Sequence, residues 1–112
     1  MKAYEILEEA SLLATGAPSL PLVKKTGVGL INTVLCDSGF EAICALSDEL
    51  SFKTARDSAS VAKGIAALIC LLLGDDTAAA SWRNVYESSK NGLKRHISRV
   101  KNTAFGGGDI ED

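Results

Sequence analysis

The feature that most constrains the fold is a nearly uninterrupted apolar run over residues 65–73 that stops at Gly74. The run is well short of the roughly 20 apolar residues that a membrane-spanning helix needs. Apolar residues recur at helical spacing before and through it, and a helix that is apolar almost all round is surrounded by other elements. The sequence therefore predicts a central helix that begins after an N-cap at Ser51 or Thr54 and ends at Gly74, with residues 61–73 in the middle of the core.

A second amphipathic pattern begins almost immediately after Gly74. Asp75 and Asp76 suit the start of a helix, where side-chain oxygens accept backbone N–H bonds and negative charge favours the dipole. A turn this short predicts that the two helices lie side by side as an antiparallel hairpin. The positions that recur at four-and-three spacing along the second helix are Trp82, Tyr86, Ser89, Leu93, Ile97 and Val100.

The N-terminal half carries two more helical patterns. Residues 3–14 have the spacing of an amphipathic helix. Pro21 suits the first position of another helix, which we expect to reach about Asp37, because the N–H that proline lacks is not needed there. The inward positions of this helix are predicted to be Leu22, Val23, Leu30, Ile31, Val34 and Leu35.

Glycines qualify this prediction in two places. Gly27 and Gly29 each cost a helix roughly 1 kcal/mol relative to alanine, so they either permit close helix packing or interrupt the helix that starts at Pro21. Gly39 suits the end of a helix. Residues 40–46 are expected to form a short extra helix, with one side made of Phe40, Ile43 and Leu46.

The chain has 112 residues, of which 46% are hydrophobic, and it fits one domain that buries its own core. We predict an all-α fold: a small bundle of four to five helices with a C-terminal antiparallel helical hairpin. This single helical domain is expected over residues 1–105. Residues 106–112 are expected to be a flexible acidic C-terminal tail, because a short run of glycines and carboxylates cannot pack on its own.

Charge is distributed unevenly along the chain. Residues 1–52 carry three basic and seven acidic side chains, residues 53–101 carry nine basic and four acidic ones, and the last eleven residues carry three acids. The predicted basic face of the last helix consists of Arg83, Lys90, Lys94, Arg95, Arg99 and Lys101. Such a face is either an ordinary solvated surface, a site for an acidic protein or a site for nucleic acid.

The three cysteines, Cys36, Cys44 and Cys70, are odd in number and lie within apolar helical patterns. We therefore interpret them as buried free thiols in a reducing compartment. No secretory signal is recognisable in the first residues, so we expect synthesis in the cytosol.

Residues with the potential for catalysis or metal binding do not form a recognisable set. The single His96 lies in the basic run without a second ligand at zinc-site spacing, and the paired carboxylates are explained by helix ends and solvent faces. The TGVGL stretch lacks the strand that precedes a dinucleotide-binding loop. We expect neither an enzyme nor a bound cofactor or metal.

The stretch that begins at ALSDEL and continues through VAKGIAALICLLLGDDTAAASWRNVYESSK resembles the head-to-tail connector (adaptor, or neck) proteins of tailed bacteriophages. In that family an L-S-D-E-L segment precedes a helix rich in small residues, a Gly-Asp turn, and a helix with spaced aromatic, Tyr and Glu positions. The matching residues here are 46–50, 61–73, Gly74 with Asp75, and then Trp82, Tyr86 and Glu87. The likeness is best over residues 45–90 and looser over the N-terminal helices.

This resemblance implies a helical virion structural protein without enzyme activity. It implies a homo-oligomeric ring beneath the portal protein, contacts with tail-completion proteins, and a channel through which DNA passes without sequence-specific recognition. Membrane contact is not expected. The protein would reside in the host cytoplasm during assembly and then in the virion neck. Ring adaptors of this family engage the portal through extended terminal segments. The resemblance therefore implies a candidate portal-binding segment that consists of Asp109, Ile110, Glu111 and Asp112.

The glycine pair of residues 27 and 29 and the absence of a long loop between helices depart from the family pattern, which leaves the ring geometry open. The alternative interpretation is a small helical nucleic-acid-binding regulator that uses the basic face of residues 83–101. It would bind DNA in a salt-sensitive manner, and changing Lys94 and Arg95 to Glu would weaken that binding.

Overall fold

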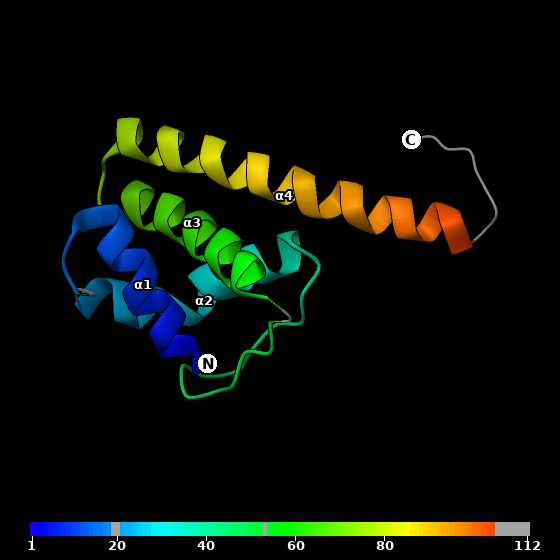
Figure 1. Ribbon diagram of the computed structural model, residues 1–112. Helices are drawn as coiled ribbons and strands as arrows, with labels where there is room; N and C mark the ends of the chain where they lie inside the picture. Colours follow the sequence, from blue (N-terminus) through cyan, green and yellow to red (C-terminus); the bar gives the residue numbers. More distant parts are fainter. Residues whose placement is uncertain (19–20, 53, 105–112) are drawn as a thin grey trace.

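The computed structural model describes residues 1–18, 21–52 and 54–104, with the helix backbone alone for residues 91–104. It contains four α-helices, and no strand occurs within these ranges. The protein is thus an all-α bundle, as the sequence predicts (Figure 1). The helices are α1 (Ala3–Thr15), α2 (Pro21–Asp37), α3 (Ala55–Leu72) and α4 (Asp76–Ala104).

α3 is the central helix, because α1, α2 and α4 all pack against it. Ile65 and Ile69 are fully buried, and α3 supplies much of the remaining core. The predicted centre of the core is therefore confirmed as far as Cys70. Beyond it the prediction is wrong: Leu71, Leu72 and Leu73 are exposed, because the end of α3 has neighbours on fewer sides.

α3 and α4 form the predicted antiparallel hairpin (Figure 1). Thr54, rather than Ser51, caps α3: its hydroxyl accepts a hydrogen bond from the N–H of Asp57 at 3.2 Å. Gly74 adopts a left-handed φ of 84° in the turn, a conformation that glycine adopts without steric penalty. Asp75 then caps α4 by accepting a hydrogen bond from the N–H of Ala78 at 3.0 Å.

Two glycines allow close helix packing. A Cβ atom on Gly27 would lie 2.7 Å from a methyl carbon of Leu7, and one on Gly64 would lie 2.8 Å from Val34 and 2.9 Å from Tyr86. α2 is continuous through Gly27, so the glycine pair does not interrupt it. On α2, Val23, Ile31, Val34 and Leu35 are buried as predicted, whereas Leu22 is half exposed.

The predicted short helix over residues 40–46 is absent, because side chains satisfy the backbone of this segment instead. The Asn32 amide donates to the carbonyl of Ile43 at 2.9 Å and accepts from its N–H at 2.8 Å. The Asp48 carboxylate accepts from the N–H groups of Cys44 and Ala45 at 2.8 and 3.1 Å. These bonds hold the segment in a non-helical path of bends and a turn between α2 and α3.

The same segment clasps the beginning of the chain. The N–H groups of Ala3 and Tyr4 donate to the carbonyls of Asp48 and Leu46, and the N–H of Leu50 donates to the carbonyl of Met1. The Glu49 carboxylate accepts from the terminal ammonium at 3.0 Å. Residues 46–50, the LSDEL sequence, are therefore a structural clasp for α1.

The cysteine prediction is correct at one position of three. Cys70 is buried, with burial raising the pKa of its thiol, but Cys36 and Cys44 are exposed. Cys36 lies near the end of α2 and lines an open pocket there, and Cys44 lies in the non-helical segment that replaces the predicted helix. The predicted tail, residues 106–112, falls outside the described residues, and so does Phe105.

Candidate functional site

A concave surface runs along the α3–α4 hairpin. One part, of about 510 Å³, lies where the end of α2 meets α3 and α4. A second part, of about 210 Å³, continues along the hairpin towards its turn. The two parts share the lining residues Ala67, Leu68 and Arg83. We call the combined feature the hairpin groove.

Small side chains make the hairpin groove deep. Its lining includes Gly64 and Ala67 from α3, and Ala79 and Ala80 from α4. The nearly complete burial of Tyr86 beside Gly64 closes its base. A floor of small and apolar residues between two helices is suited to receiving another helix.

One end of the hairpin groove holds a polar cluster that joins α2 to α4. The hydroxyl of Tyr86 donates to Asp37 at 2.6 Å, and Ser38 lies 2.9 Å from the same hydroxyl. Lys90 Nζ lies 2.8 Å from Asp37 and 3.0 Å from Glu87. Since Asp37 and Lys90 are 53 residues apart, the cluster fixes the end of α2 against α4.

The electrostatics of this cluster favour its present protonation states. Burial, and then the hydrogen bond to Asp37, raise the pKa of Tyr86 to about 12. The hydrogen bond to Asp37, followed by the bond to Glu87, raises the pKa of Lys90 to about 12. Both groups keep their protons at neutral pH, so neither Tyr86 nor Lys90 offers a general base, and both hydrogen-bond to Asp37 across the α2–α4 junction.

The predicted basic face is only partly formed by the residues whose side chains are described. Arg83 is exposed and lines the hairpin groove. Lys90 was expected on a solvated face, but it is almost completely buried and paired with two carboxylates. The side chains of Lys94, Arg95, Arg99 and Lys101 lie outside the described part, as do Asp109, Ile110, Glu111 and Asp112.

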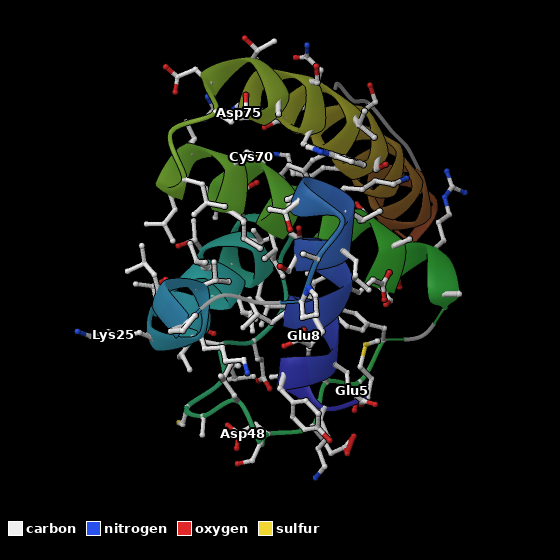
Figure 2. All side chains as sticks on the ribbon, turned by 90° about the vertical axis from the view of Figure 1, so that its left-hand side faces the viewer. Glu5, Glu8, Lys25, Asp48, Cys70 and Asp75 are labelled. Atoms are coloured by element: carbon white, nitrogen blue, oxygen red, sulfur yellow. The ribbon has the colours of Figure 1, made fainter. Side chains whose placement is uncertain are left out.

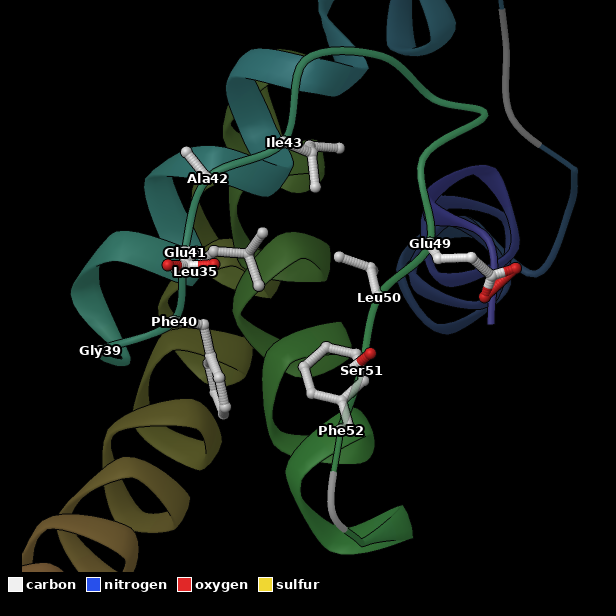
Figure 3. Close-up of a pocket in the computed structure, with 10 residues that line it drawn as sticks. All are labelled: Leu35, Gly39, Phe40, Glu41, Ala42, Ile43, Glu49, Leu50, Ser51 and Phe52. Atoms are coloured by element: carbon white, nitrogen blue, oxygen red, sulfur yellow. The ribbon is translucent and has the colours of Figure 1, made fainter.

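A separate pocket of about 360 Å³ is lined by Leu35 and by residues 39–43 and 49–52 of the segment between α2 and α3. The rings of Phe40 and Phe52 meet edge to face, with centroids 5.3 Å apart. In Figure 3 Leu50 points into the pocket, whereas Glu49 points away towards α1. The polar groups therefore do not converge on a point, as they would to orient a small ligand.

Exposed leucines gather at one end of the bundle. The C-terminal ends of α1 and α3 meet there, with Cys70 Sγ 4.0 Å from the carbonyl of Ala14, and α2 begins at the same end (Figure 1). Figure 2 views this end, with Asp75 beside the α3–α4 turn and Lys25 on α2. Exposed apolar patches are typical of contact surfaces. The leucines are Leu12, Leu13, Leu22, Leu71, Leu72 and Leu73.

Among the side chains that the structure describes (residues 1–18, 21–52 and 54–90), no three from His, Cys, Asp or Glu lie close enough together to hold a metal ion. Within the same ranges, no helix is both long and apolar enough to cross a bilayer. The chain matches no known protein family, and neither a curated protein nor a solved structure is significantly similar to it.

Sequence reasoning missed the polar cluster. It assigned Tyr86 to the apolar stripe and to the family resemblance, without a hydrogen-bond partner, and gave Asp37 no role beyond the helix end. The available signal was Tyr86 itself, because a buried tyrosine hydroxyl usually has a hydrogen-bond partner. The identity of that partner depends on the packing of α2 against α4, which the sequence pattern does not give.

Proposed function

We propose that the protein is a head-to-tail connector of a tailed bacteriophage or prophage, an adaptor that binds the portal protein and bridges capsid to tail. The proposal starts from the resemblance over residues 45–90. It is supported by what those residues do in the fold. Residues 46–50 clasp α1, residues 61–70 build the core, Gly74 and Asp75 make the hairpin turn, and Tyr86 joins α4 to α2.

The observation that carries the proposal is the length and direction of α4. It has 29 residues, and Figure 1 shows it extending well past the other three helices. The end of α4 at Ala104 is therefore well away from the other three helices (Figure 1). An adaptor that reaches another protein with its terminal segment needs this arrangement, and the acidic residues Asp109, Glu111 and Asp112 follow within that segment.

In this function the protein has no enzymatic activity. Its partners are the portal and tail-completion proteins, and copies of the chain assemble into a ring through which DNA passes. The exposed leucines at the opposite end of the bundle provide a second contact surface, suited to a tail-completion protein. The protein would be found in the host cytoplasm during assembly and in the virion neck afterwards.

Reconstitution with the portal protein encoded in the same genome tests the proposal. We expect the full chain to form a stable complex with the portal ring, detected by native mass spectrometry and located by cryo-electron microscopy. Truncation after Phe105 should weaken binding. The full-length variant D109N/E111Q/D112N keeps the tail length and separates the contribution of charge from that of chain contact.

Failure of the full chain to bind its portal ring would overturn the adaptor function. Equal binding by the truncated and full chains would instead overturn the role of the tail. A portal or capsid gene beside the coding sequence would support the same assignment independently.

The nucleic-acid-binding alternative has less support. Lys90 is paired with Asp37 and Glu87, so it is not available to phosphates in this conformation. Changing Lys94 and Arg95 to Glu tests the alternative. Salt-sensitive DNA binding that this change abolishes would favour a regulator, and the absence of binding at low salt would remove that candidate.

A further inference from the structure

The far end of α4 extends past the other described helices. α4 has 29 residues and α3 has 18, so at about 1.5 Å per residue α4 is longer by roughly 16 Å. Figure 1 shows this extra length beyond the start of α3 and beyond α1 and α2. We call residues 91–104, which include this extra length, the distal part of α4.

The sequence of the distal part is that of a helix with a partner. Apolar residues continue at four-and-three spacing through Leu93, Ile97 and Val100. A helix with an apolar stripe is stable in water when another surface covers the stripe. Among the described helices, neither α1 nor α2 extends along this part of α4 (Figure 1), so a helix that covers the stripe would come from another molecule.

The hairpin groove matches this helix in size. Along α4 its lining runs from Asp76 to Glu87, and along α3 it runs from Gly64 to Leu71. Twelve residues of helix span roughly 17 Å, or three turns. An apolar stripe over residues 93–100 spans about two turns and fits within that length.

The charges of the two surfaces are complementary. The hairpin groove is lined by the carboxylates of Asp37, Asp76 and Glu87 and by one guanidinium, that of Arg83. Lys90 pairs with two of these carboxylates, and the carboxylates of the lining outnumber its one guanidinium. The distal part has no acidic residue and four fixed cations: Lys94, Arg95, Arg99 and Lys101.

We infer that the distal part of α4 docks in the hairpin groove of a second copy of the chain. The groove is formed by the first half of the same helix, so a continuous α4 cannot fill its own groove. Each copy therefore has one helix to donate and one groove to fill. Such a head-to-tail contact repeats from copy to copy and gives a ring when the rotation closes. This inference rests on the proposed adaptor function only for ring closure.

Sedimentation of the full chain at concentrations up to about 1 mM tests the contact, because weak associations are populated there. The wild type should self-associate, less strongly at high salt. Ala80→Trp fills the groove at an exposed position and should raise the dissociation constant at least about tenfold. Ser81→Trp is the control: it adds the same side chain at an exposed α4 position outside the groove lining.

A complementary pair of variants addresses the donated helix. Ile97→Lys interrupts the apolar stripe and should abolish self-association, whereas Ser98→Lys adds the same charge outside the stripe and should retain it. Circular dichroism and thermal melting of each variant establish that the bundle is folded.

Mixing the two disabled variants gives the decisive result. A80W retains an intact distal helix, and I97K retains an intact groove, so an equimolar mixture should form heterodimers and nothing larger. Self-association of A80W alone at wild-type strength would mean that the distal helices pair with each other, and it would overturn the inference. A monomeric wild type would also overturn it.

These outcomes are separable from the adaptor function. Truncation after Phe105 leaves residues 91–104 in place, so the truncated chain should self-associate normally while binding the portal less well. A chain that binds its portal ring but does not use the groove would retain the proposed function and lose this inference. Self-association through the groove without portal binding would have the reverse meaning.

Discussion

α3 and α4 are joined by one short turn and pack against each other, yet they differ in what surrounds them. α3 contacts all three other helices, and nine of its residues are buried. Within residues 76–90 of α4, burial is confined to Ala79, Tyr86 and Lys90. One helix is thus enclosed by its own chain, and its partner is covered along one side.

The difference indicates that the two helices have separate roles. α3 is rich in small residues, so three helices approach it closely. Substitutions in α3 should therefore change the free energy of unfolding. α4 is tied to the bundle by α3 and by the junction of Tyr86 and Lys90 with Asp37. Its remaining surface is available for contacts with other molecules, and substitutions there should act on assembly.

The largest expected effect compares an apolar side chain on each helix. Ile65 on α3 is fully buried, whereas Val85 on α4 is 41% exposed. Ile65→Ala should lower the free energy of unfolding by about 2–5 kcal/mol, because it removes buried methyl groups and leaves a cavity. Val85→Ala should change it by less than about 0.5 kcal/mol. Urea titration measures both, and similar losses would contradict the division of roles.

Substitution of Gly64 and of Gly29 by alanine tests whether close helix packing depends on the position of the glycine. Gly64→Ala would place a Cβ atom 2.8 Å from Val34 and 2.9 Å from Tyr86, and we expect a loss of about 1–3 kcal/mol from overpacking. Gly29 lies in α2 with nothing within 4 Å of a Cβ atom, so Gly29→Ala should stabilise by roughly 0.5–1 kcal/mol. Thermal melts that shift in the same direction for both variants would show that Gly64 is not a close contact.

The junction between α2 and α4 gives a pH-dependent prediction. Tyr86→Phe removes the hydrogen bond to Asp37 and should cost about 1 kcal/mol. The pKa of Tyr86 is raised from 10.0 to about 12, so the folded protein retains a phenol proton that the unfolded chain releases near pH 10. The stabilisation is therefore complete below pH 10 and is lost as the pH rises towards 12.

Lys90 acts in the same direction, since its pKa is raised from 10.5 to about 12. Stability should thus decrease between about pH 10 and pH 12, and Tyr86→Phe should reduce the decrease. Absorbance of tyrosinate provides a second measurement: the component that Tyr86→Phe removes should titrate near pH 12. A component that titrates near pH 10 would contradict the buried junction.

The smallest expected effect concerns a polar atom inside α3. The hydroxyl of Ser60 is buried and has no hydrogen-bond partner among the described residues. Ser60→Ala should therefore be neutral or should stabilise by up to about 1 kcal/mol. Ser81→Ala on the exposed side of α4 is the control, and a clear loss of stability in Ser60→Ala alone would reveal a partner for this hydroxyl.

Local patterns in the sequence were sufficient to predict the helices. The Pro21–Asp37 helix, the turn at Gly74 and the hairpin all depend on residues close together in the chain, and all are confirmed. The sequence left the cap of α3 open between Ser51 and Thr54, and the structure shows Thr54. The short helix over residues 40–46 was wrong because Asn32 and Asp48 offer its backbone other partners. Apolar spacing alone does not reveal that competition.

Burial at the edges of the bundle was also harder to predict. Cys36 and Leu72 fit helical patterns as well as Cys70 does, but no helix covers them. The candidate site depends on contacts over long separations, such as that between Asp37 and Lys90. The hairpin groove arises from the angle between helices of small residues, which a spacing pattern does not specify.

The clasp between residues 1–4 and 46–50 has a consequence for the order in which the chain folds. Its hydrogen bonds join segments more than forty residues apart, so forming them requires closing a long loop, whose entropic cost delays such contacts. The α3–α4 hairpin needs only a three-residue connection. We therefore expect the hairpin to form early on refolding and the clasp to form last, locking α1 in place after the other helices have assembled.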